Sequence, residues 1–147
     1  MSSTNVTLED KIEGKTPQPF YSELRAARMI YNFAADGGAV STLTPKNSTL
    51  LPATAVIVGA TINSTTAVTS GGAGTLAVGT SAGSSTTSIL AATAKASLSA
   101  NALLNGVPVF ATPLKLSAAG QLNVTIGTAA LTAGIVEVVV YYYTAYA

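Results

Sequence analysis

The sequence predicts an all-β fold, a jelly-roll-like antiparallel β-sandwich of about eight strands with an extended N-terminal arm. Two runs of alternating aliphatic residues flank a bend rich in Gly and Thr within residues 51–80. The aliphatic residues share one side of each run: Val56, Val58, Ala60 and Ile62 in the first, and Leu76 and Val78 in the second. A period of two is typical of half-buried strands. Turn signals then recur about every 8–12 residues, which favours many short strands.

Residues 1–23 are expected to form an extended arm that has no core of its own. Pro17 and Pro19 resist both helix formation and ladder pairing. Two interpretations remain open, a disordered tail or an arm that orders on a neighbouring protein. Phe20 and Tyr21 favour the second, because they can bury apolar surface on a partner. Residues 24–147 are then the sandwich domain, and a chain of this size buries about 70% of its unfolded surface.

The chain after the arm is expected to begin with a strand over about Ala26–Ala34, where aromatic residues alternate with polar ones. The alternative is a helix capped by Ser22 and stopped by Gly37. Residues 36–38 predict a turn. Thr42–Leu51 is expected to be a short strand or loop, since a proline interrupts it.

The middle of the chain predicts strands over residues 56–67 and 74–80, followed by a polar loop at residues 81–87. Ser88 could cap one helical turn over Ser88–Thr93. Residues 94–104 are weakly patterned and are expected to be irregular or to form a short strand.

Asn105-Gly106 is the strongest two-residue turn signal in the chain. It is expected to lead into a strand at Val107–Phe110, in which Pro108 implies an edge position. Leu114–Leu116 is expected to be a further strand. The clearest alternation follows at residues 121–127, where the inward residues are Leu122, Val124 and Ile126 and the solvent-facing residues are Asn123 and Thr125.

A turn at residues 131–134 is expected to lead into a C-terminal strand, Ile135–Tyr143, that is apolar on both faces. One face carries Ile135, Glu137, Val139, Tyr141 and Tyr143, and the other carries Val136, Val138, Val140 and Tyr142. A strand of this kind is buried on both faces, either centrally in the sandwich or by another subunit. Both interpretations remain open, and Tyr141, Tyr142 and Tyr143 are the candidate residues of an oligomer interface, because tyrosine offers large area and a hydroxyl.

Composition narrows the possible functions. The 147 residues include no cysteine and no histidine, so thiolate chemistry, a Ser-His-Asp triad and the commonest metal ligand are excluded. The net charge of +1 predicts no attraction to nucleic acid or to an anionic membrane. After Lys46 only Lys95, Lys115 and Glu137 are charged. A body so poor in charge indicates a protein that covers its surface with partners. No secretory signal and no membrane span are expected.

Short motifs give no catalytic or cofactor site. Residues 72–77 fit the letters of a dinucleotide fingerprint, but a strand is expected after them where a helix is needed. Gly14-Lys15-Thr16 resembles the end of a phosphate-binding loop, but the first glycine of that motif is missing. No spacing of carboxylates suggests an acid–base pair or a calcium loop. We therefore expect no enzyme activity, no cofactor and no metal.

Several segments resemble small jelly-roll structural proteins of tailed-bacteriophage virions, in particular head decoration, or cement, proteins. These segments are Leu51-Pro52-Ala53 with Val56-Ile57-Val58, residues 74–80, Leu114-Lys115-Leu116 and residues 131–138. The resemblance covers about Leu24 to Tyr143. It implies a protein made in the host cytoplasm that sits on the outside of an assembled capsid, usually as a homotrimer, and stabilises the shell by bridging capsid subunits. Its partners would be the major capsid protein and further copies of itself.

In this interpretation the arm clamps the major capsid protein or an adjacent subunit. Its candidate contact residues are Glu9, Asp10, Lys11, Glu13, Lys15, Phe20 and Tyr21. The alternative function is a head-fibre or tail-fibre receptor-binding module that recognises host surface glycans, for which Phe110 and Tyr146 are the candidate aromatic residues. A third possibility is a cellular surface or pilus-like subunit, and the absence of an expected signal peptide argues against it.

Overall fold

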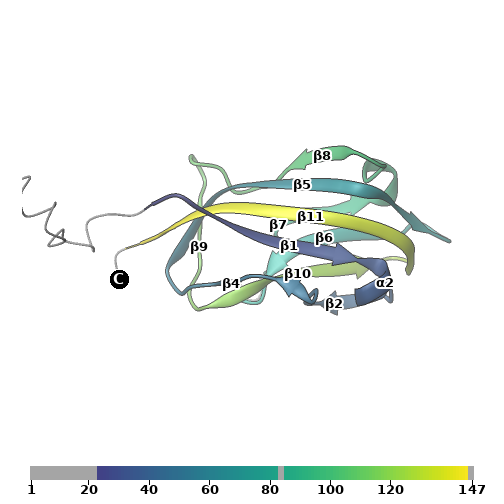
Figure 1. The fold of residues 1–147 in the computed structure, drawn as a ribbon, viewed down its shortest axis with the longest axis horizontal. Helices are drawn as coiled ribbons and strands as arrows, with labels where there is room; N and C mark the ends of the chain where they lie inside the picture. Colours follow the sequence, from purple (N-terminus) through teal and green to yellow (C-terminus); the bar gives the residue numbers. More distant parts are fainter. Residues whose placement is uncertain (1–22, 83–84, 146–147) are drawn as a thin grey trace, which may run out of the picture.

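Two antiparallel sheets pack face to face in the computed structural model, which describes residues 23–82 and 85–145 (Figure 1). Eight strands of three or more residues lie in these ranges: β1 (Arg25–Asn32), β2 (Ser41–Leu43), β5 (Ala55–Ser70), β6 (Thr75–Thr80), β7 (Ser85–Ala94), β8 (Ala102–Asn105), β10 (Gly120–Gly127) and β11 (Leu131–Thr144). Three two-residue strands extend the sheets: β3 (Asn47–Ser48), β4 (Leu50–Leu51) and β9 (Leu114–Lys115). A helical turn, α2 (Phe33–Asp36), and a 3₁₀ turn, η2 (Lys95–Ser97), complete the described elements.

The strand pairing is that of a jelly roll. The first sheet has the order β3-β1-β11-β5-β8 with β9 also on β5, and the second has the order β2-β10-β6-β7 with β4 also on β10. When the eight longer strands are counted along the chain, the first pairs with the eighth, the second with the seventh, the third with the sixth and the fourth with the fifth. This nested pairing is a folded-over hairpin with two Greek keys. The predicted fold class is therefore confirmed for the part of the chain that the structure describes, whereas the expected arm lies outside it.

The core lies between the two sheets and takes its side chains from the inward face of each strand. β10 and β6 supply the register expected from alternation, with Val124 opposite Val78 and Ile126 opposite Leu76, and all four side chains are buried. The prediction that Asn123 faces solvent is wrong. It lies on the outward face of β10 but is only 6% exposed, and its side-chain oxygen has no hydrogen-bond partner within the described residues.

A β-bulge in β5 changes which residues face the core. Tyr142 of β11 pairs with Ile57 and Tyr141 pairs with Gly59, so Val58 is an extra residue on the β5 side. The bulge shifts the alternation by one position. Ile57, Ala60 and Ile62 therefore join the core cluster, whereas Val56 and Val58 are buried outside it. The prediction that Val56, Val58, Ala60 and Ile62 share one side is wrong for the first two.

β1 ends earlier than predicted because Asn32 begins a turn of helix. The Asn32 side-chain oxygen accepts a hydrogen bond from the Ala34 N–H at 3.0 Å, and Asp36 accepts one from the Asn32 N–H at 2.9 Å. Gly37, with φ +84°, ends the turn and donates to the Phe33 carbonyl. The strand prediction is thus confirmed up to Asn32, and Gly37 is a stop for a helix of only four residues.

Three other local predictions are wrong, since the backbone partners of these segments are not those that the local signal suggests. Ser88–Thr93 is not a helical turn but part of β7, where Leu90 pairs with Val78 of β6. Val107–Phe110 is not a strand, since only an isolated bridge joins Val109 to Thr112. The expected turn at residues 131–134 is the beginning of β11, where Gly134 (φ +143°) sits at an irregularity in the pairing with β5.

Gly106 crosses between the two sheets instead of reversing the chain. Its N–H donates to the Ala60 carbonyl on β5, and the next N–H, that of Val107, donates to the Ile89 carbonyl on β7, both at 2.8 Å. A Cβ at position 106 would lie 2.5 Å from the Ala60 Cβ, so only glycine fits. The segment therefore connects the two sheets, and the prediction of a two-residue turn at Asn105-Gly106 is wrong.

Candidate interaction surface

Two of the described carboxylates, those of Asp36 and Glu137, have partners within the chain and lie apart from each other in structural roles. Asp36 accepts from the Asn32 and Lys46 backbone N–H groups, and Glu137 lies 2.5 Å from the Arg28 Nε. Within residues 23–82 and 85–145 no three His, Cys, Asp or Glu side chains could jointly hold a metal ion. Among these residues there is also no helix long and apolar enough to cross a membrane.

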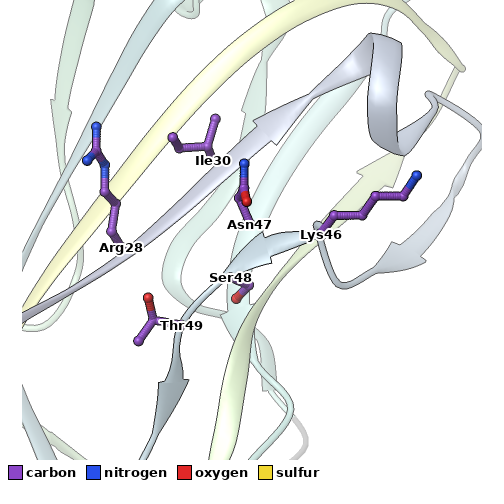
Figure 2. A pocket seen from close by; sticks show the side chains of 6 residues that line it. All are labelled: Arg28, Ile30, Lys46, Asn47, Ser48 and Thr49. Carbon is purple, nitrogen blue, oxygen red and sulfur yellow. The ribbon is translucent and has the colours of Figure 1, made fainter.

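A shallow depression of about 430 Å³ lies beside β1 and β3 (Figure 2). Its lining residues are Arg28, Ile30, Lys46, Asn47, Ser48 and Thr49. Figure 2 shows Arg28 and Lys46 at opposite sides of this depression, with Ile30 and Asn47 between them, so the two cations do not converge on one point. Glu137 already pairs with Arg28. The depression is thus a patch of polar surface and lacks the geometry of an anion or substrate site.

The outward face of the first sheet is broad and carries mixed polar and apolar residues. Cross-strand register gives one row of Asn47, Ile30, Glu137, Asn63 and Leu103, a second of Arg28, Val139, Thr61 and Asn105, and a third of Ala26, Tyr141 and Gly59. Ile30, Glu137 and Val139 are half-buried. The charged residues in these rows are Arg28 and Glu137, which pair with each other, so the rest of the face is uncharged.

The three C-terminal tyrosines do not act as one group. Tyr142 is only 8% exposed and belongs to this chain's own core. Tyr141 is 36% exposed on the outward face, where Gly59 opposite it leaves room for its ring. Tyr143 pairs with Val56 on the same outward face and is half-buried. The strict alternation of the strand already contained this distinction, and only Tyr141 and Tyr143 are available to a partner.

The most exposed large apolar side chain of the described residues lies in residues 106–113, which we call the Phe110 loop and which include the expected strand Val107–Phe110. Val109 and Thr112 exchange two backbone hydrogen bonds, of 3.0 and 3.3 Å, around a tight turn with Phe110 and Ala111 at its tip. The Phe110 side chain is 75% exposed, and those of Val107 and Val109 are exposed as well. The sequence predicted a strand here because a strong turn signal precedes Val107, but two prolines in the loop disfavour ladder pairing.

Tyr31 is the one described side chain with a strongly shifted pKa. It is fully buried, and its hydroxyl donates to the Gly37 carbonyl oxygen at 2.7 Å. Burial, and secondly the negative charge of Asp36, raise the pKa of Tyr31 to about 12. This phenol ties the end of β1 to the turn after α2 and is a structural group.

The predicted arm contacts Glu9, Asp10, Lys11, Glu13, Lys15, Phe20 and Tyr21 lie outside the described residues. The described chain begins at Glu23, just before the position where Arg25 of β1 pairs with Tyr142 of β11. The arm is therefore attached at the end of the first sheet where the C-terminal tyrosines lie.

The chain folds as a jelly-roll β-sandwich, and the solved structures with a similar fold include chains in phage capsid structures. A chain in the capsid asymmetric unit of cyanophage Pam1 superposes with a TM-score of 0.62 and 17% identity, covering 85% of this chain and 87% of the other. For a chain of the Helicobacter pylori bacteriophage KHP30 capsid the values are 0.58, 13%, 84% and 89%. For one of the Ralstonia phage GP4 capsid they are 0.57, 19%, 88% and 90%. No protein-family model and no curated protein matches the sequence.

Proposed function

We propose that this chain is a non-enzymatic structural protein of a phage virion, a decoration protein that binds the outside of the capsid and stabilises it by bridging capsid subunits. The observation that carries the proposal is the likeness to chains in three phage capsid structures over at least 84% of this chain and 87% of each of those chains. The likeness covers most of this chain and most of each of those chains, so it is not confined to one part of the sandwich.

The charge distribution supports a role in assembly. The described sandwich holds few charged side chains, and one of the acidic ones, Glu137, is paired within the chain. A surface with so few charges has little electrostatic repulsion against other proteins, which favours association. Many copies binding one shell at once would add affinity although each contact is weak.

Two contacts complete the proposal. Residues 1–23 clamp the major capsid protein or an adjacent subunit, through the charged residues of the arm together with Phe20 and Tyr21. A second copy of the chain covers Tyr141 and Tyr143 on the outward face of the first sheet, and three copies assemble around a common axis. Tyr142 is left out of this contact, because its side chain is already buried in the core.

The test uses heads of the encoding phage from a strain in which the gene for this chain is deleted. Added protein is expected to sediment with these heads and to raise the temperature at which they open. Deletion of residues 1–20 removes most of the arm and is expected to abolish binding, while circular dichroism and the solution mass stay those of the full chain. Failure of the full chain to bind overturns the proposed function. Undiminished binding of the shortened chain overturns the clamp.

The solution mass tests the second contact. One chain has a mass of 14.6 kDa, and light scattering is expected to give three times that value. Tyr141→Ser changes an exposed ring and is expected to lower that mass without unfolding the chain. A monomer that persists at high concentration contradicts the trimer.

A further inference from the structure

We infer that the Phe110 loop is a second, rigid contact with the shell, in which the Phe110 ring enters an apolar pocket of a capsid subunit beside the site where the arm binds. This inference rests on the proposed function. It adds which surface of the chain contacts the shell and the chemical character of the pocket that receives it.

Exposure alone makes the loop unusual. A phenyl ring that is 75% exposed, next to exposed Val107 and Val109, leaves apolar area in water without compensation. Large exposed apolar patches mark interaction sites, and here three large exposed apolar side chains lie within four consecutive residues. Aromatic side chains in the centre of an interface also contribute most of its affinity, because they fill pockets on the partner.

The loop is held in place before any partner binds. At its start the Gly106 and Val107 N–H groups are bonded to β5 and β7. At its end Leu114 and Lys115 pair with Ile57 and Val56, and the Leu116 N–H donates to the Ala55 carbonyl at 2.8 Å. Pro108 and Pro113 restrict the backbone between these fixed points. A loop whose two ends are fixed loses less backbone entropy on binding than a free segment would, which favours affinity.

The position of the loop selects the partner. Across the end of the first sheet the order is β1, β11, β5 and β9, so β9 lies three strand spacings, about 14 Å, from the start of β1 where the arm is attached. Figure 1 shows β4, β9, the start of β1 and the end of β11 at one end of the sandwich. Apart from Tyr141, which the proposed contact between copies covers, the exposed large apolar side chains at this end are Leu24 just before β1, Leu50 in β4, and Val107, Val109 and Phe110 in the loop that precedes β9. A shell subunit that holds the arm therefore meets an apolar surface, and the Phe110 loop belongs to it.

The chemistry of the loop favours a protein over a membrane or a glycan. Residues 106–113 carry no charge, so they offer no attraction to anionic lipid headgroups. A sugar is recognised by hydrogen-bonding groups around an aromatic platform. Around Phe110 the loop supplies Val, Ala and Pro, with the Thr112 hydroxyl as its one polar side-chain group. An apolar protein pocket is the surface that such a loop complements.

The experiment measures binding to heads from the gene-deletion strain for the full chain, Phe110→Ala and Val40→Ala. Val40 is the matched control, because it is 56% exposed and precedes β2 at the other end of the sandwich. Phe110→Ala is expected to weaken binding at least tenfold, and Val40→Ala to change it less than twofold. Both variants change exposed side chains, so their melting temperatures are expected to equal that of the full chain.

The outcomes separate the two proposals. If the full chain does not bind heads, the proposed function fails. If the full chain binds and Phe110→Ala binds equally well, the proposed function stands and the loop contact is overturned. A glycan array on which the full chain binds a sugar and Phe110→Ala does not would also overturn it, because the ring would then serve a carbohydrate.

Discussion

Replacing Tyr31 by Phe removes one hydroxyl from the core and gives a change in stability that depends on pH. At neutral pH the variant loses the 2.7 Å hydrogen bond to the Gly37 carbonyl, so its free energy of unfolding falls by about 1 kcal/mol. At high pH the wild-type protein must bind a proton on Tyr31 in order to fold, which lowers its free energy of unfolding, whereas the variant has no phenol to protonate. The folded state holds the phenol proton up to a pKa of about 12, against 10.0 for a free tyrosine.

The sign follows from proton linkage. Because the folded pKa is raised, the stabilisation is complete below pH 10 and is lost as the pH rises from 10 towards 12. Two pKa units correspond to a total loss of about 2 to 3 kcal/mol, of which about 1 kcal/mol is lost by pH 11. The wild type and Tyr31→Phe are therefore expected to have equal free energies of unfolding near pH 11, and the variant is expected to be the more stable of the two near pH 12.

Urea unfolding followed by far-ultraviolet circular dichroism at pH 7, 9 and 11 measures this difference. Other groups that titrate at high pH are common to both proteins and cancel in the comparison. A difference between wild type and Tyr31→Phe that is the same at pH 7 and pH 11 would refute the reasoning.

Two further predictions concern the seam between the sheets and the outward face of the first sheet. Gly106→Ala is expected to lower the free energy of unfolding by about 1 to 3 kcal/mol, since its Cβ would overlap Ala60, whereas Gly71→Ala, which meets no atom within 4 Å, is expected to be neutral or stabilising. Equal stability of the two variants in urea would contradict the crossing role of Gly106. Glu137→Gln removes the partner of a largely exposed Arg28, so a loss of about 1 kcal/mol or less is expected in thermal unfolding, and less still at high salt. A large, salt-independent loss would mean that this pair is a buried group.

Alternating residues identified most strands correctly where one face of the strand is buried and the other is not. β10 and β6 are the clearest cases, because Leu122, Val124, Leu76 and Val78 face the core as their spacing predicts. The alternation in β11 also placed Tyr142 on the face opposite Tyr141 and Tyr143, without showing which face is in the core, and β1 was predicted despite a competing helical pattern.

The predictions failed where the chain departs from regular pairing. The bulge at Val58 arises from the register between β5 and β11, strands that are more than 60 residues apart in sequence at this point, so no local pattern contains it. Ser88–Thr93 has the capping residue of a helix, but pairing with β6 supplies its hydrogen bonds instead. The role of Gly106 depends on two carbonyl groups, of Ala60 and Ile89, that belong to different sheets.

The sequence by itself determined the class of fold, the approximate number of strands, the absence of histidine and cysteine chemistry and the scarcity of charge, because these follow from composition and from a period of two along the chain. Only the tertiary structure decided the nested strand order, the phase of β5, the burial of Tyr142 and the presentation of Phe110 at the end where the arm is attached. These features depend on which strands pair although they are far apart in the sequence. The exposure of a residue is then set by the side chains that this pairing places next to it.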